Sequence, residues 1–183
     1  MKSNFATFTK NLVADDIDFP LYLAAEYFAD EHFLDLIAKD DLLSITVGRE
    51  RWVLVEFSYI QETPFVGACL SALGAAGYRP VIAHVERYRF VAQNQAKWLT
   101  KFTQGNAVLQ GDIGSLSGQY GEAVKRAALS LLKGRKIDIW GTDLHNPLQL
   151  QKYIAPGLAK LRAIQAAPRL NALLDPMING IVA

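Results

Sequence analysis

The sequence predicts an α/β fold built on a parallel sheet. Short apolar runs alternate with longer segments of helical periodicity, as in successive βα units. The apolar runs are nearly continuous, which is typical of strands covered on both faces. Three of the helical segments stop at a glycine, the residue that most often follows the last helical turn. These observations predict strands at 21–26, 51–57, 80–84, 107–110 and 137–142.

Helices are expected between these strands, at 64–76, 94–104, 121–133 and about 147–166, with a further helix before Asp15. The chain contains no repeat, low-complexity tract or linker, so we expect a single domain over residues 1–183. Five strands are too few for a closed barrel, which generally needs about eight. We therefore expect either an open sheet or the later part of a larger barrel.

Composition excludes several classes of function. The formal net charge is +1, and no run rich in lysine or arginine suggests a nucleic-acid partner. The apolar stretches are only strand-length, and the N-terminus lacks the apolar core of a secretory signal, so a cytoplasmic location is expected. Cys69 is the single cysteine and lies in an apolar helical segment, where a thiol behaves as a small hydrophobic group.

Two short runs, 83–88 and 141–146, carry metal-binding side chains directly after predicted strands. The carboxyl ends of parallel strands are where α/β folds place their chemistry. Imidazoles and carboxylates that converge there can bind divalent metals. The sequence thus predicts a metal-centred active site at the mouth of an α/β barrel.

Asp143 and His145 lie on the same side of an extended segment, because alternate side chains point the same way. They can share one metal or bridge two, although Asp143 could instead cap the helix that begins near Pro147. His84 ends its strand as either a satisfied core residue or a site residue. Beside it, Arg87 suits a phosphate, since guanidinium matches phosphate oxygens.

Glu26 and Glu56 each follow an apolar strand, where a carboxylate is costly to bury unless it is paired or bound to a metal. Each could also be a solvated strand end, and Glu86 could serve only to hold Arg87. His32 lies in a polar segment, 30–33, that we expect to be exposed, and no role is assigned to it. The 114–118 segment is either a phosphate-wrapping loop or a plain turn.

Taken in order, several segments resemble the PHP-domain protein-tyrosine phosphatases of bacterial capsule and exopolysaccharide gene clusters. The matching segments are 24–33, 53–57, 77–88, 109–110 with 114–121, and 141–146. The runs around His84 and Asp143 are the most specific, and the others gain weight from their order. The family's opening H-x-H strand has no counterpart here, so the resemblance implies a PHP-type distorted (β/α)7 TIM-like barrel that is N-terminally incomplete, with about five parallel strands and flanking helices.

The resemblance also implies a function. Glu26, Glu56, His84, Asp143 and His145 would be metal ligands, and Arg87 would hold the substrate phosphate. The family uses up to three metals, commonly manganese, with iron, zinc or magnesium as alternatives. The implied reaction is hydrolysis of phosphotyrosine on proteins by metal-activated water, in which Arg87, Asp143 and His145 take part. The implied partner is a bacterial tyrosine kinase whose activity controls capsule or exopolysaccharide synthesis.

Two other functions stay open at this point. The chain could be an inactive PHP remnant that acts as a binding or assembly partner, or a PHP phosphoesterase for a small phosphate ester. Missing barrel strands would leave a sheet edge and apolar surface uncovered, which proteins usually cover or pair. We therefore expect self-association as a homo-oligomer, or an N-terminal rearrangement that covers the gap.

Overall fold

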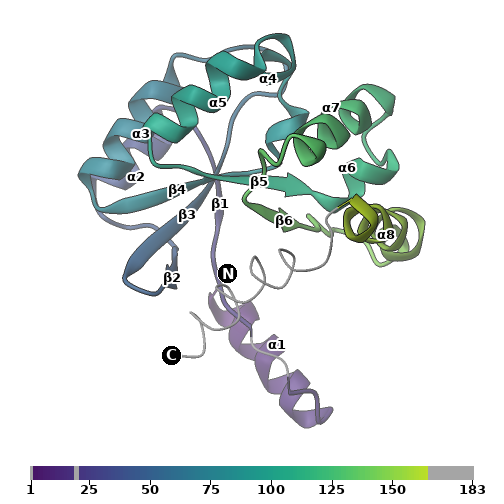
Figure 1. The fold of residues 1–183 in the computed structure, drawn as a ribbon. Coiled ribbons are helices and arrows are strands. Elements are labelled where there is room, and N and C mark those ends of the chain that lie inside the picture. Colours follow the sequence, from purple (N-terminus) through teal and green to yellow (C-terminus); the bar gives the residue numbers. More distant parts are fainter. Residues whose placement is uncertain (1, 19–20, 165–183) are drawn as a thin grey trace.

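A parallel sheet with helices packed around it confirms the predicted α/β class (Figure 1). The computed structural model describes residues 2–18 and 21–164. Its six-stranded sheet has the order β1-β3-β4-β5-β6, all parallel, while β2 pairs antiparallel with β3. The strands are β1 (Glu26–Phe28), β2 (Ile45–Val47), β3 (Glu50–Glu56), β4 (Tyr78–Ile82), β5 (Val108–Asp112) and β6 (Ile139–Gly141).

Most of the predicted helices are present within one or two residues of their expected ends. The α-helices are α1 (Lys2–Ala14), α2 (Glu31–Ala38), α3 (Phe65–Ala75), α4 (Arg89–Gln93), α5 (Gln95–Gln104), α6 (Ile113–Ser117), α7 (Glu122–Lys133) and α8 (Ala155–Ile164). A 3₁₀ turn, η1 (Val85–Arg87), follows β4, and a π-helical turn, η2 (Leu150–Ile154), precedes α8. The last predicted helix therefore splits into η2 and α8, and its end at 165–166 lies outside the described residues.

The first strand differs from the prediction. The strand expected at 21–26 begins only at Glu26, so this glutamate opens β1 instead of closing a strand. β2 was not predicted, because three residues are too few to give a periodic signal. It joins β3 through the two-residue loop Gly48-Arg49, and Gly48 has φ +60°. A positive φ at the first loop residue suits a tight hairpin turn, a conformation that glycine adopts readily.

Two short helices lie in segments where no helix was predicted. The 30–33 segment begins α2, where Asp30 accepts a hydrogen bond from the Phe33 amide at 2.8 Å. Phe33 is buried, so the expectation of an exposed segment was wrong there, although His32 is exposed. The 114–118 segment lies in α6, with Gly118 at φ +97° as its C-cap, so neither a plain turn nor a loop describes it.

The core lies between the sheet and the helices that cover it. The larger cluster of buried side chains joins α2, α3 and α5 to strands β3 and β4, and a smaller one joins α6, α7 and α8. Cys69 is buried in the larger cluster, and burial raises the pKa of its thiol to about 11, as expected for an inert cysteine.

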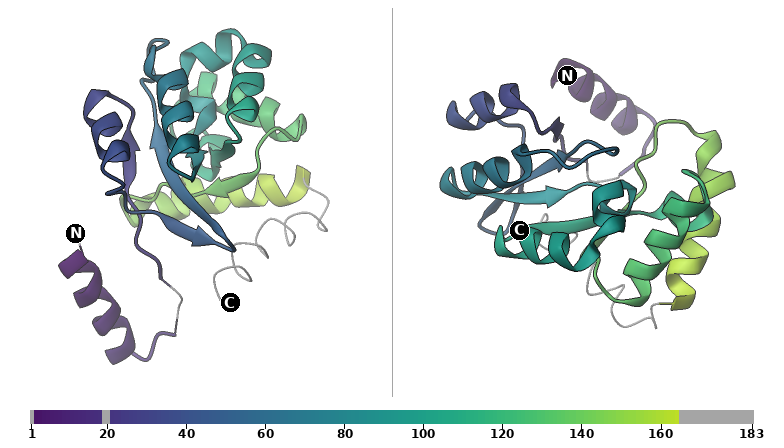
Figure 2. Two further views of the ribbon diagram at one scale, coloured as in Figure 1. Left: turned by 90° about the vertical axis from the view of Figure 1, so that its left-hand side faces the viewer. Right: turned by 90° about the horizontal axis from the view of Figure 1, so that it is seen from above.

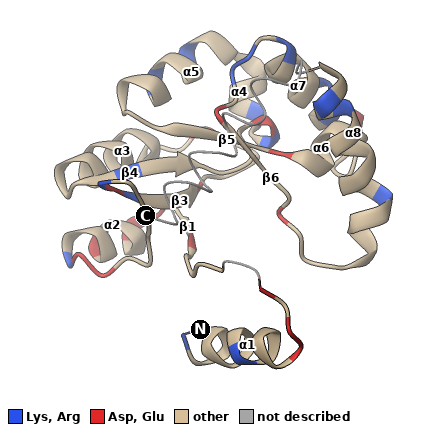
Figure 3. Cartoon of the chain, turned by 60° about the horizontal axis from the view of Figure 1, so that its bottom comes forward, with Lys and Arg blue, Asp and Glu red and all other residues tan. Residues whose placement is uncertain are grey.

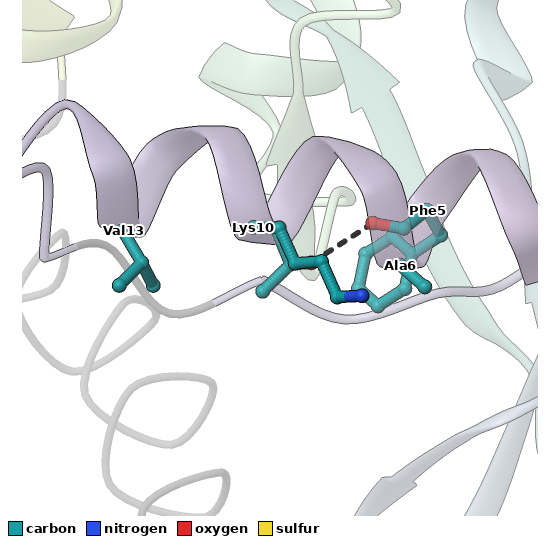
Figure 4. A pocket seen from close by; sticks show the side chains of 5 residues that line it. Phe5, Ala6, Lys10 and Val13 are labelled. Carbon is teal, nitrogen blue, oxygen red and sulfur yellow. Dashed lines mark hydrogen bonds between the residues drawn. The ribbon is translucent and has the colours of Figure 1, made fainter.

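Helix α1 stands apart from the sheet in two views (Figures 1 and 2). None of its described residues is buried, and Phe5, Lys10 and Val13 lie along one side of it (Figure 4). Acidic residues lie on α2 and in the loop after α1, and basic residues include some on α5, α7 and α8 (Figure 3). Among the described residues, no helix has the length and apolar character that crossing a bilayer requires.

Candidate metal centre

Three predicted ligands come together beside the carboxyl ends of β3 and β4. Glu56 is the last residue of β3, and His84 lies two residues beyond the end of β4. Glu26, at the start of β1, is in register with Leu54 on the neighbouring strand. Because these strands are parallel and adjacent, side chains from three separate segments can reach one point.

The distances among these side chains fit a metal site. His84 Nε2 lies 2.9 Å from Glu26 Oε1 and 3.7 Å from Glu56 Oε2. One ligand atom from each residue lies within 4.8 Å of the other two, the one such group of three in the described part of the chain. Two carboxylate oxygens and one imidazole nitrogen form a donor set that suits manganese, iron or zinc. The residues present therefore fit the kind of metal that the sequence predicts.

His84 is held in an unusual backbone conformation. It has φ +31° and ψ +55°, a left-handed geometry that costs energy for a residue with a side chain. Its ring is buried next to Tyr59 and Tyr88, with centroids 5.5 and 5.9 Å away. Nε2 faces both carboxylates, whereas Nδ1 is buried without a hydrogen-bond partner in the described residues. The turn thus aims the imidazole at the carboxylates.

Tyr59 connects this group to Arg87. Its hydroxyl donates a 2.6 Å hydrogen bond to Glu56 Oε2, and the Arg87 guanidinium carbon lies 4.6 Å from the centre of its ring. Burial, followed by the bond to Glu56, raises the pKa of Tyr59 far above its usual value, so the hydroxyl stays protonated and keeps donating.

Arg87 lies between two tyrosine rings and pairs with a carboxylate. The centre of the Tyr120 ring lies 4.1 Å from the Arg87 guanidinium carbon, and the centre of the Tyr59 ring lies 4.6 Å from the same carbon. Its Nη1 donates to Asp143 Oδ2 at 2.8 Å. Burial alone would lower the pKa of Arg87, but the neighbouring Tyr59, Tyr120 and Asp143 raise it overall, so the guanidinium is fully charged.

Asp143 and His145 lie next to one another but outside the group of three. His145 Nδ1 is 2.8 Å from the Asp143 carbonyl oxygen and 3.5 Å from its Oδ1. The His145 side chain is 75% exposed, whereas the Asp143 side chain is 21% exposed and faces Arg87. The alternative reading of Asp143 as a helix cap is wrong. Asn146 Oδ1 accepts a 2.9 Å hydrogen bond from the Leu148 backbone amide, so Asn146 caps the helix that follows.

Glu86 contributes to the site by holding the turn that carries Arg87 against β5 and α6. It is 3% exposed, and its Oε1 accepts hydrogen bonds from Ser115 Oγ at 2.6 Å and from the Asp112 amide at 3.0 Å. Burial raises the pKa of Glu86 to about 7. This residue ties the turn that carries Arg87 to the start of α6, a structural role that agrees with the expectation that it holds Arg87 in place.

A family model described as "Capsular polysaccharide synthesis, CpsB/CapC" matches residues 1–165. The chain belongs to the CpsB/CapC family. Tyrosine-protein phosphatase YwqE of Bacillus subtilis is 29% identical over 137 residues, which are 75% of this chain and 53% of YwqE. The putative tyrosine-protein phosphatase CapC of Staphylococcus aureus is 25% identical over 126 residues, 69% of this chain and 48% of CapC. The chain thus spans about half the length of these CpsB/CapC relatives.

A solved structure confirms the fold of this CpsB/CapC chain. It comes from work on YwqE of Bacillus subtilis and CpsB of Streptococcus pneumoniae, described there as metal-dependent tyrosine phosphatases. The superposition has a TM-score of 0.76 at 24% identity and covers 96% of this chain and 68% of the other. The PHP-type resemblance read from the sequence is therefore confirmed for family and fold.

Sequence reasoning missed Tyr59 and Tyr120, the two rings around Arg87. Tyr59 follows strand β3, and Tyr120 follows helix α6 within the 114–121 segment, where sequence reasoning assigned it no role. The signal that could have found them is position alone, because loops after adjacent parallel strands meet at one edge of the sheet.

Proposed function

We propose that this chain hydrolyses phosphotyrosine on proteins with the help of manganese or a similar divalent metal, as a single domain over residues 1–183. The observation that carries the proposal is the position of Arg87, which is linked through Tyr59 to the group of Glu26, Glu56 and His84. A group of metal-ligating side chains and a guanidinium on one edge of the sheet suit a substrate with a phosphate. Among the relatives, YwqE is named a tyrosine-protein phosphatase and CapC a putative one.

Each residue has a proposed part in the reaction. Glu26, Glu56 and His84 hold metal, and Asp143 and His145 add ligands from the loop after β6. Bound metal supplies Lewis acidity, which lowers the pKa of water and offsets charge on phosphate oxygens. Arg87 orients the phosphate by exchanging its bond to Asp143 for bonds to phosphate oxygens. Asp143 is then released from Arg87 and becomes available as a ligand.

We further propose that the phosphotyrosine protein is a bacterial tyrosine kinase and that its dephosphorylation regulates capsule or exopolysaccharide synthesis. The family description and the names of the relatives support this partner. Such a substrate would place the chain in the cytoplasm. Self-association that covers the open sheet edge belongs to the same proposal.

Comparison of three substrates tests the proposed function: a phosphotyrosine peptide, a phosphoserine peptide and a small sugar phosphate, each with manganese. We expect the phosphotyrosine peptide to be turned over fastest. Arg87→Lys should lower kcat/KM on it by about tenfold to a hundredfold, because lysine cannot reproduce the planar pair of donors. Arg162→Lys on α8 is the matched control, since Arg162 is exposed and far along the chain from the site residues. Preference for the sugar phosphate would overturn the assignment in favour of a small-ester phosphoesterase.

A further inference from the structure

A cleft of about 360 Å³ lies beside Arg87. Its walls come from the loop after β3, from η1 and the start of α4, and from α7 with the segment that precedes it; they include Tyr59, Ile60, Tyr120, Ala123, Val124 and Ala127. This volume is at the lower end of the range for ligand sites, about 300–1,000 Å³, and suits one side chain better than a whole cofactor. The small alanines of α7 leave the space that the cleft occupies.

The cleft combines an apolar wall with a positive rim. Ile60 is 72% exposed and offers apolar surface at the cleft, beside Ala123, Val124 and Ala127 of its α7 wall. The charge of Arg87 is offset by Asp143 at 2.8 Å. Arg89, which also lines the cleft, is exposed and has no ion pair with any residue in the described ranges. The uncompensated charge of Arg89 favours a ligand that carries negative charge close to an apolar group.

Arg87 lines this cleft and is also the proposed phosphate contact. A protein substrate whose phosphate reaches Arg87 must therefore carry its neighbouring residues past the cleft. Residues in an extended chain advance by about 3.3 Å each, so those within two positions of the phosphorylated residue stay close to it. A phosphotyrosine adds nearly two negative charges, which complements the arginines.

From this continuity we infer that the cleft is a specificity subsite for one large apolar side chain, located within two residues of the phosphotyrosine in the substrate protein. The inference rests on the proposed function for the identity of the phosphate group. It assigns Ile60, Ala123, Val124 and Ala127 to recognition of the neighbouring side chain, and Arg89 to attraction of the charged peptide.

Binding of non-hydrolysable peptides tests the subsite without relying on turnover. The peptides carry phosphonomethyl-phenylalanine in place of phosphotyrosine, with alanine at all flanking positions or leucine at a single position from two before to two after it. Fluorescence anisotropy with the full chain and manganese gives each Kd. Leucine at one position should tighten binding about tenfold over alanine, the scale at which a pocket distinguishes apolar groups of different size.

Filling the cleft should remove this preference. In Ala123→Trp and Ala127→Phe, the ratio of the alanine and leucine Kd values should fall toward one. Ala96→Trp, at an exposed position on α5 that does not line the cleft, should keep the full ratio. The subsite is refuted if leucine improves binding by less than about twofold at every position, or if the improvement survives in both filled variants.

The same peptides, made with phosphotyrosine, separate this inference from the proposed function. Hydrolysis without a leucine preference in binding overturns the subsite alone. A leucine preference in binding without hydrolysis supports the subsite and overturns the enzymatic activity. Failure of every peptide to bind overturns both.

Discussion

At the scale of single residues, the position of Arg87 depends on contacts from three directions. Tyr59 and Tyr120 stack against the guanidinium, and Asp143 accepts its hydrogen bond. The strand-end position of Arg87 could be read from the sequence, and so could its suitability for phosphate. Its aromatic neighbours could not, because they come from loops that are brought together only by the order of strands in the sheet.

The same limit applies to the other candidate ligands. Sequence position predicted Glu56 and His84 at strand ends, and the structure brings both together with Glu26. The left-handed turn at His84 could not be read from the sequence, since positive φ is uncommon in any residue other than glycine. His145 was expected beside these residues but is largely exposed.

The buried carboxyl of Glu86 should make stability depend on pH. Burial raises its pKa from 4.5 to about 7 in the folded protein. Between those values the folded protein keeps a proton that the unfolded chain has released, so the free energy of unfolding falls as pH rises. This contribution is fully present below pH 4.5 and is lost as pH passes through about 7.

Glu86→Gln should remove this dependence, because an amide keeps the acceptor oxygen for Ser115 but does not titrate. We expect denaturant unfolding of the unmodified chain to lose on the order of 2 kcal/mol over this pH interval, and the variant to lose much less. Glu62→Gln, at an exposed ion pair with Lys97, is the control that should follow the unmodified chain. Identical pH profiles for Glu86→Gln and the unmodified chain would contradict the account.

At the scale of elements, the ends of helices were predicted better than the existence of short ones. The ends of α3, α5 and α7 lie close to the predicted bounds, because amphipathic spacing and a following glycine mark them. Helices α2 and α6 are brief, and each begins at an aspartate that caps its first turn. An aspartate cap followed by a helix of only about one or two turns gives too little periodicity to be recognised.

The packing of α8 on α6 gives a prediction in which two glycines should respond in opposite directions. A Cβ at Gly157 in α8 would collide with the backbone carbonyl of Ile113, whereas a Cβ at Gly74 in α3 would meet no atom within 4 Å. Alanine normally stabilises a helix interior by about 0.5–1 kcal/mol relative to glycine. Gly74→Ala should therefore raise the melting temperature.

Gly157→Ala should lower the melting temperature, because α8 must move away from α6 to make room for the methyl group. Overpacking of this kind should lower the free energy of unfolding by about 1–3 kcal/mol. Thermal unfolding followed by circular dichroism measures both variants under one condition. A stabilised Gly157→Ala protein would show that the contact between α6 and α8 is not close enough to exclude a methyl group.

At the scale of the whole molecule, the sequence predicted five parallel strands, and the described residues form five, with the short antiparallel β2 in addition. Continuous apolar runs identified these strands, and the order in which they pair could not be read from them. In the described ranges the sheet is open, with β1 and β6 at the two ends of its strand order. An open sheet presents unpaired backbone groups at its edges.

Self-association remains a prediction at this scale. Exposed apolar side chains on and after α1, including Phe8, Val13 and Ile17, add surface that favours association. Light scattering coupled to size-exclusion chromatography should give a mass above that of one chain, rising with protein concentration. A single species with the mass of one chain at all concentrations would contradict it.

The central claim is that metal held by Glu26, Glu56 and His84 supports hydrolysis of phosphotyrosine beside Arg87. Initial rates on a phosphotyrosine peptide across a manganese titration test it most directly. The account predicts a saturable rise in rate that Glu56→Gln lowers by at least about a hundredfold, through loss of a metal ligand, while Glu62→Gln retains it. A folded chain with no turnover at saturating manganese, or a Glu56→Gln variant with an unchanged manganese dependence, would contradict the claim.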